Sequence, residues 1–141
     1  MTSNEETRLI NSIKSLEDYE ETSKNLMKLM EINPNKALLY AEDILSNRKG
    51  DEYLQASAFD TLYSLDINRA MTFTKNNINE IDVYLLGTII NNVTADSGII
   101  NKNPIIKNFV SYIKEFLSNK RLLDFERIKD DIDWFNITYS T

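Results

Sequence analysis

The chain of 141 residues contains no cysteine and no histidine. These absences exclude disulfide bonds, thiol nucleophiles, imidazole bases, haem ligation and the usual structural zinc sites. Glycine and proline are also scarce, at 3 and 2 residues, which suits helices joined by tight turns. The chain has no Gly-rich phosphate-binding loop and no Gly-x-Ser-x-Gly nucleophile elbow. We therefore predict that the protein is not an enzyme and takes no cofactor, metal or small-molecule substrate.

A long apolar run is missing as well. The longest uncharged stretch, residues 83–95, is interrupted by threonines and asparagines and is too short to span a bilayer. The first residues are polar and acidic, unlike a signal peptide. The lack of cysteine gives no sign of an oxidising compartment. These features predict a cytoplasmic protein that does not bind membranes.

Basic residues are outnumbered, with 16 Lys and Arg against 22 Asp and Glu and a formal net charge of −6. Binding to nucleic acid or to anionic lipid needs a basic surface, so neither is expected as a direct partner. An acidic surface favours a basic protein partner, mainly by steering the encounter. The alternative is that this modest charge only keeps the protein soluble.

Apolar residues recur three and four positions apart over most of the chain, which indicates amphipathic helices. We expect N-caps at Ser15, Asn33, Asp51, Asp66 and Asn103, and the third helix to end at residues 49–50 (KG). These start and stop signals predict about eight helices: residues 5–14, 16–32, 34–48, 52–65, 67–78, 81–93, 104–117 and 121–136.

The chain also contains an internal repeat. Residues 33–40 (NPNKALLY) match residues 66–73 (DINRAMTF) as cap, any residue, Asn, base, Ala, aliphatic, any residue, aromatic. In the helices that follow, Tyr53, Leu54, Ala56, Phe59 and Leu62 correspond to Tyr84, Leu85, Gly87, Ile90 and Val93. We therefore predict an all-α fold, a short right-handed α-solenoid of stacked helical hairpins in a single domain, residues 1–141. The alternative is a chance likeness between amphipathic helices.

Without histidine or cysteine, catalysis would fall to carboxylates, lysine, serine or tyrosine, and acidic pairs are easy to find in the sequence. Two carboxylates could serve glycoside hydrolysis or hold Mg²⁺. However, nothing in the sequence places such pairs opposite one another, and Asp131 and Asp133 are two residues apart in a predicted helix, where side chains do not face each other. We interpret the carboxylates as caps and solvated helix faces.

The repeat segments, in particular 35–37 (NKA), 68–70 (NRA) and 58–66 (AFDTLYSLD), resemble bacterial immunity proteins of the HEAT/armadillo-like helical type. Such proteins accompany toxins of contact-dependent growth inhibition and related polymorphic toxin systems. Within this class the chain is most similar to the all-helical inhibitors of EndoU-like RNase toxins. The resemblance implies a protein that neutralises a cognate nuclease toxin by occluding its basic active-site cleft. A non-inhibitory helical-repeat adaptor or subunit is the alternative.

The second helix of each hairpin usually lines the concave, ligand-binding side of such stacks. With Leu54, Ala58, Leu62 and Leu65 placed in the core, and with the acidic last helix beside them, we expect the toxin interface to comprise Glu52, Asp60, Tyr63, Tyr84, Asn91, Asp130, Asp131, Asp133 and Trp134.

For Trp134, burial as the last core residue is the favoured interpretation and a docking role the alternative. Should this interface be wrong, the next candidates are the convex face and the acidic residues Glu17, Asp18, Glu20 and Glu21.

Overall fold

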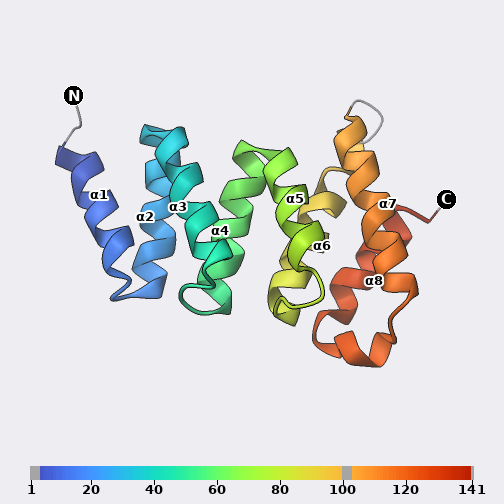
Figure 1. The fold of residues 1–141 in the computed structure, drawn as a ribbon. Coiled ribbons are helices and arrows are strands. Elements are labelled where there is room, and N and C mark those ends of the chain that lie inside the picture. The colour runs from blue at the N-terminus through green and yellow to red at the C-terminus, as the bar shows by residue number, and fades with distance from the viewer. Residues whose placement is uncertain (1–3, 100–102, 141) are drawn as a thin grey trace. The chain divides into compact units, whose positions relative to one another are not determined.

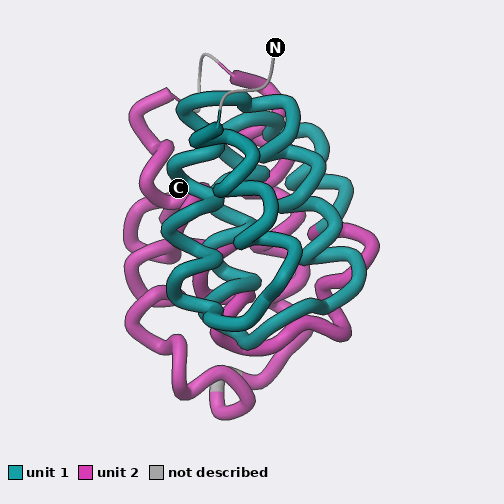
Figure 2. The backbone as a smooth tube through the Cα atoms, turned by 90° about the vertical axis from the view of Figure 1, so that its left-hand side faces the viewer, with its two compact units in different colours: residues 1–73 teal, residues 74–141 magenta. Residues whose placement is uncertain are grey.

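The computed structural model describes residues 4–99 and 103–140. Every regular element in these ranges is a helix, which confirms the all-α prediction. The chain forms two compact units, Met1–Phe73 and Thr74–Thr141, coloured separately in Figure 2. The expectation of one domain over residues 1–141 stays a prediction.

The first unit consists of helices that pack against their neighbours in the chain. They are α1 (Asn4–Ser15), α2 (Tyr19–Ile32), α3 (Pro34–Ser46), α4 (Glu52–Leu65) and the first part of α5 (Ile67–Asn77). The helices from α1 to α4 lie side by side in chain order (Figure 1), and α2 packs against α4 as well as α3.

The predicted caps explain most of these helix boundaries. Asn33, Asp51 and Asp66 each accept a hydrogen bond from the backbone N–H three positions on, at 3.2, 2.8 and 3.1 Å. α3 ends at Ser46, and the left-handed residue that follows its C-cap Asn47 is Arg48, with a φ of 50°, rather than the expected Gly50. The Lys49 N–H donates to the Ile44 carbonyl at 2.9 Å and closes the last turn. The helix therefore ends a few residues before the predicted stop at residues 49–50.

The predicted cap at Ser15 is wrong. Ser15 is the last residue of α1, and its hydroxyl donates to the Ser12 carbonyl at 2.9 Å. Leu16 has a φ of 52°, which turns the chain away from the helical path. The cap of α2 is Asp18, whose carboxylate accepts from the Glu21 N–H at 3.1 Å, so α2 begins three residues later than expected.

The core of the first unit comes from the apolar stripes of these helices. Its large, fully buried side chains are Leu9, Leu26, Leu29, Ile44, Leu54, Phe59 and Leu62. The ring of Phe59 lies 6.1 Å from that of Tyr63 and 6.3 Å from that of Phe73, centroid to centroid.

Polar contacts join the odd-numbered helices at matching positions of the repeat. In α3, Lys36 Nζ lies 3.9 Å from the carboxylate of Glu6 in α1, and the Asn33 side-chain amide donates to the same carboxylate at 2.6 Å. In α5, Arg69 occupies the position of Lys36, and its guanidinium lies 3.4 Å from Glu42 in α3. The repeated base therefore reaches an acid on the preceding odd-numbered helix in both cases.

The second unit is built around α6 (Val83–Ala95). The other elements after α5 are η1 (Ser97–Ile99), α7 (Pro104–Ser118), η2 (Leu122–Ile128) and α8 (Lys129–Thr138), and α6 packs against each of them. The N-cap of α6 is Asp82, which accepts from the Tyr84 N–H at 2.7 Å, so the helix starts at Val83. The Asn103 cap and Pro104 at the start of α7 are as predicted.

The prediction of one continuous helix over residues 121–136 is wrong. A 3₁₀ segment, η2, precedes α8, and within it Phe125 departs from helical geometry with φ −121° and ψ 28°. Its ring lies 6.2 Å from that of Phe116 in α7. Aromatic packing of Phe125 against Phe116 takes precedence here over regular helical hydrogen bonding.

Close contact between α6 and α8 depends on Gly87. A Cβ at this position would lie 2.8 Å from Ile128 Cγ2 and 2.9 Å from Asp131 Oδ2, closer than these atoms can approach. Further along the contact, the buried Tyr139 hydroxyl donates to the Val93 carbonyl of α6. Burial raises the pKa of Tyr139, and the charge of Asp96 raises it further.

Candidate functional site

The nine residues of the predicted interface belong to both units. Glu52, Asp60 and Tyr63 lie on α4 in the first unit, while α6 and α8 in the second carry Tyr84, Asn91, Asp130, Asp131, Asp133 and Trp134. Among them, Asn91 and Asp131 are in direct contact, through a hydrogen bond. That all nine form one surface stays a prediction.

On α4, the expected side-chain directions are partly wrong. Asp60 is exposed and Glu52 is half-buried, but Tyr63 is only 9% exposed and packs on Phe59. Leu65, expected in the core, is only half-buried. The reason is that α4 packs against both α2 and α3, so it buries residues on more than one face.

On α6, Asn91 and Tyr84 are half-buried rather than exposed. The Asn91 side-chain amide donates to Asp131 Oδ1 at 2.8 Å, and this bond joins α6 to α8. The guanidinium of Arg127 lies 5.3 Å from the centroid of the Tyr84 ring, a distance typical of a cation–π contact. Asn91 and Asp131 are therefore engaged within the protein, which weakens the case for both as interface residues.

On α8, Trp134 is exposed, contrary to the favoured interpretation. Phe135 and Ile132 occupy the core positions, at 0% and 1% exposure, while Trp134 is 47% exposed on another face. Ile137, one turn further on, is 75% exposed, and Asp130, one turn earlier, is also exposed. Positions 130, 134 and 137 share one side of a helix. We call Asp130, Trp134 and Ile137 the α8 surface.

The carboxylates of Asp133 and Asp130 interact with Lys129 in different ways. Asp133 lies 2.9 Å from the Lys129 ammonium, and this hydrogen bond is the main cause that raises the pKa of Lys129. The charge of Asp130 adds to the same shift.

Sequence reasoning found Asp130 and Trp134 but missed Ile137, although its spacing from Trp134 on a short helix was the available signal.

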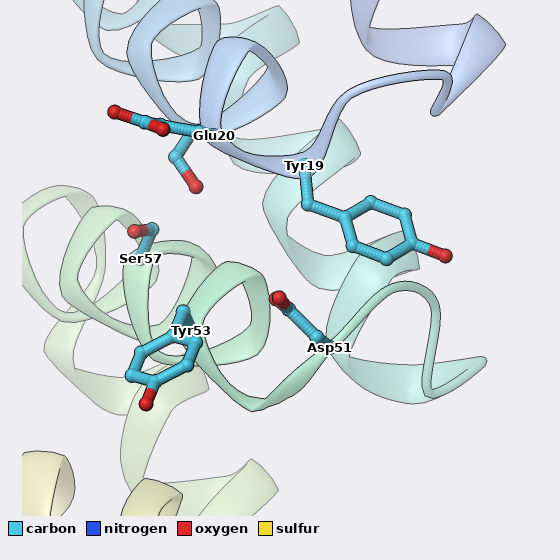
Figure 3. Close-up of a pocket in the computed structure, with 6 residues that line it drawn as sticks. Tyr19, Glu20, Asp51, Tyr53 and Ser57 are labelled. Carbon is cyan, nitrogen blue, oxygen red and sulfur yellow. The ribbon is translucent and has the colours of Figure 1, made fainter.

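A second feature, which the sequence did not predict as a site, is a groove between the first turns of α2 and α4 in the first unit. Its volume is about 450 Å³, and we call it the α2–α4 groove (Figure 3). Tyr19 and Tyr53 are 41% and 56% exposed, and Asp51 lies between them in Figure 3. The groove is lined by Tyr19, Glu20, Ser23, Asp51, Tyr53 and Ser57.

The lining of the α2–α4 groove is acidic, since it contains two carboxylates and no basic residue. Asp51 Oδ1 accepts the cap hydrogen bond from the Leu54 N–H at 2.8 Å, and Oδ2 can accept from a ligand. Glu20 makes a solvent-exposed ion pair with Lys24 at 3.7 Å. Exposed pairs of this kind contribute little and exchange easily. The groove therefore has the chemistry to hold a cation.

Two further site types were searched for. Over residues 4–99 and 103–140, no group of three or more acidic side chains is positioned to hold a metal ion. Within the same part of the chain, no helix combines the length and hydrophobicity needed to cross a lipid bilayer.

Comparison of the chain with protein families, curated proteins and solved structures gives no match. The chain's own residues therefore carry the functional proposals.

Proposed function

We propose that this chain is an immunity protein that binds a basic nuclease toxin, an RNase, and occludes its active-site cleft in the cytoplasm. The observation that carries this proposal is the α8 surface, where Trp134 and Ile137 are exposed in adjacent turns. Tryptophan is enriched among the residues that dominate binding energy, because its large side chain can be fully desolvated by a partner. Exposed apolar side chains that gather together mark binding surfaces more often than single ones do.

Charge supports a basic partner. The chain has a formal net charge of −6, and Asp130 places a carboxylate on the α8 surface itself. An RNase cleft must attract RNA phosphates and is therefore basic. Opposite charges accelerate association and align the two surfaces, whereas the apolar anchors slow dissociation.

We further propose that the helical hairpins stack as a short right-handed α-solenoid. Two observations support this arrangement. The matched positions after each repeat are buried alike, with Leu54 and Leu62 at 0% exposure and Leu85 and Val93 at 1% and 0%. In the first unit, Lys36 and the matching Arg69 both reach an acid on the preceding odd-numbered helix. Recurrent contacts between equivalent helices are the packing unit of solenoids.

The decisive experiment is co-expression with the protein encoded next to this chain. We expect that neighbour to arrest growth when it is expressed alone and to be neutralised by this chain. In the purified complex, Trp134→Ala should raise the dissociation constant about thirtyfold, corresponding to roughly 2 kcal/mol. Asp130→Asn should mainly slow association and reduce its dependence on salt.

The matched control is Leu39→Ala, which removes a leucine that is 60% exposed on α3, in the other unit. This variant should bind and protect like the parent, with circular dichroism confirming that all variants are folded. Equal binding by Trp134→Ala and Leu39→Ala would reject the α8 surface. A neighbouring protein without toxicity would reject the immunity function and favour a non-inhibitory adaptor.

A further inference from the structure

We infer that the α2–α4 groove binds an arginine side chain presented by a partner protein. The groove combines two exposed tyrosine rings, Tyr19 and Tyr53, with the carboxylates of Glu20 and Asp51. Tyrosine faces attract cations through the ring quadrupole, and carboxylates accept charge-assisted hydrogen bonds. All these groups line one groove of about 450 Å³ within one unit of the chain.

The local charge favours a cation even though two helices begin at the groove. The N-terminus of a helix carries about half a positive charge, which repels cations. Carboxylates outnumber these two partial charges, since the caps and first turns of α2 and α4 contain Asp18, Glu20, Glu21, Asp51 and Glu52. In the turn that leads to α4, the Lys49 ammonium is held by the Asp43 carboxylate at 2.6 Å, which also lowers the pKa of Asp43.

Arginine fits this lining better than lysine does. Its guanidinium is planar, so it can stack on a tyrosine ring while its five N–H donors point outward in the same plane. The groove offers acceptors of two kinds, the carboxylates of Glu20 and Asp51 and the hydroxyls of Ser23 and Ser57. A lysine ammonium is a compact, strongly hydrated charge that cannot stack in this way.

A protein is the source of the arginine that we propose. Tyr19 and Tyr53 are 41% and 56% exposed as residues, so a side chain that protrudes from a folded surface can reach them without any opening of the helices. The identity of that protein rests on the proposed function, because a nuclease cleft presents arginines to phosphates. The chemistry of the groove itself can be tested without a toxin.

The test is a titration of the full chain, with ¹³C-labelled tyrosine, by the capped tripeptide acetyl-Gly-Arg-Gly-amide. We expect the ring resonances of Tyr19 and Tyr53 to shift and to saturate at millimolar peptide, the range of a single weakly held side chain. The tripeptide with citrulline, which has the same shape without charge, should cause no shift. The lysine tripeptide should bind at least about threefold more weakly than the arginine tripeptide.

Asp51→Asn is the informative variant, because asparagine caps a helix about as well as aspartate but lacks the charge. It should weaken binding of the arginine tripeptide about three- to tenfold. The matched control is Asp82→Asn, which makes the same substitution at the N-cap of α6 in the other unit. This control should leave the affinity unchanged.

Three results would overturn the inference: rings that do not respond, citrulline or lysine tripeptides that bind as tightly as arginine, or equal effects of Asp51→Asn and Asp82→Asn. Each is independent of the immunity function. A chain that binds the arginine tripeptide but gives no protection from its neighbour's product would reject the proposed function and keep the groove. Protection from the neighbour's product without any binding of the arginine tripeptide would keep the proposed function and reject the groove.

Discussion

The two helices that match in the repeat, α4 and α6, bury the same apolar positions but have different surroundings. In the first unit α4 packs against α2 and α3, whereas α6 packs against η2 and α8 in the second. At the matching small positions, Ala56 is buried with its Cβ present, but Gly87 has no room for one. The comparison teaches that one apolar pattern serves two kinds of packing, and that the small residue is indispensable only where the neighbouring helix approaches most closely.

The polar contacts differ between the units in a similar way. In the first unit the repeated bases Lys36 and Arg69 each make an ion pair with an acid on the preceding odd-numbered helix. In the second unit, Asn91 donates to Asp131, and Tyr139 donates to the Val93 carbonyl. The polar contacts of the first unit thus follow the repeated bases, whereas these contacts of the second unit join α6 to the last helix and the residue after it.

The largest expected effect concerns the buried positions that α4 and α6 have in common. Leu62 has no exposed surface and lies at a matched position of the repeat. Its replacement in Leu62→Ala should lower the free energy of unfolding by about 2–5 kcal/mol, because the cavity cannot collapse fully. Chemical denaturation followed by circular dichroism measures this change. The exposed Leu39→Ala should stay within about 0.5 kcal/mol of the parent, and a similar small loss for Leu62→Ala would mean that the helix face is wrongly assigned.

A smaller effect is expected where the two helices differ. Gly87→Ala must push Ile128 and Asp131 away from α6, which should cost about 1–3 kcal/mol, partly offset by the better helix propensity of alanine. Gly98→Ala is the matched control, since a Cβ there would meet nothing within 4 Å. Equal stability of the two variants in denaturant titrations would show that α6 and α8 are not packed this closely.

The smallest expected effect is a change of stability with pH that comes from Tyr139 in the second unit. Because the pKa of Tyr139 is raised in the folded protein, its contribution to stability is complete below the unfolded pKa of about 10 and is lost as the pH rises through the folded value. Tyr139→Phe should remove this loss of stability at alkaline pH. At neutral pH the variant should be less stable by about 1 kcal/mol, because it lacks the hydrogen bond to the Val93 carbonyl. The difference in stability between parent and variant at each pH is the quantity to measure. Parallel stability curves above pH 9 would contradict the assignment.

Local signals account for most of the helix boundaries. Asn33, Asp51 and Asp66 act as caps because their side chains reach a backbone N–H three residues away, a contact that depends on nothing distant in the chain. The prediction failed at Phe125, whose ring packs on Phe116 of the preceding helix, and at Tyr63, which is buried because α4 has two packed neighbours. Contacts between helices leave no periodic pattern in the sequence that could reveal them.

For the candidate sites, the sequence by itself determined the composition: an acidic chain without cysteine or histidine, in amphipathic helices that carry Asp130 and Trp134 near one another. Only the tertiary structure decided that Trp134 is exposed beside Ile137, that Asn91 and Asp131 bind each other, and that Tyr19 and Tyr53 line one groove. The physical reason is that helix periodicity is a local property, which a sequence displays directly. Which side of a helix is left exposed depends on the neighbours that cover its other sides, and packing selects those neighbours from the whole chain.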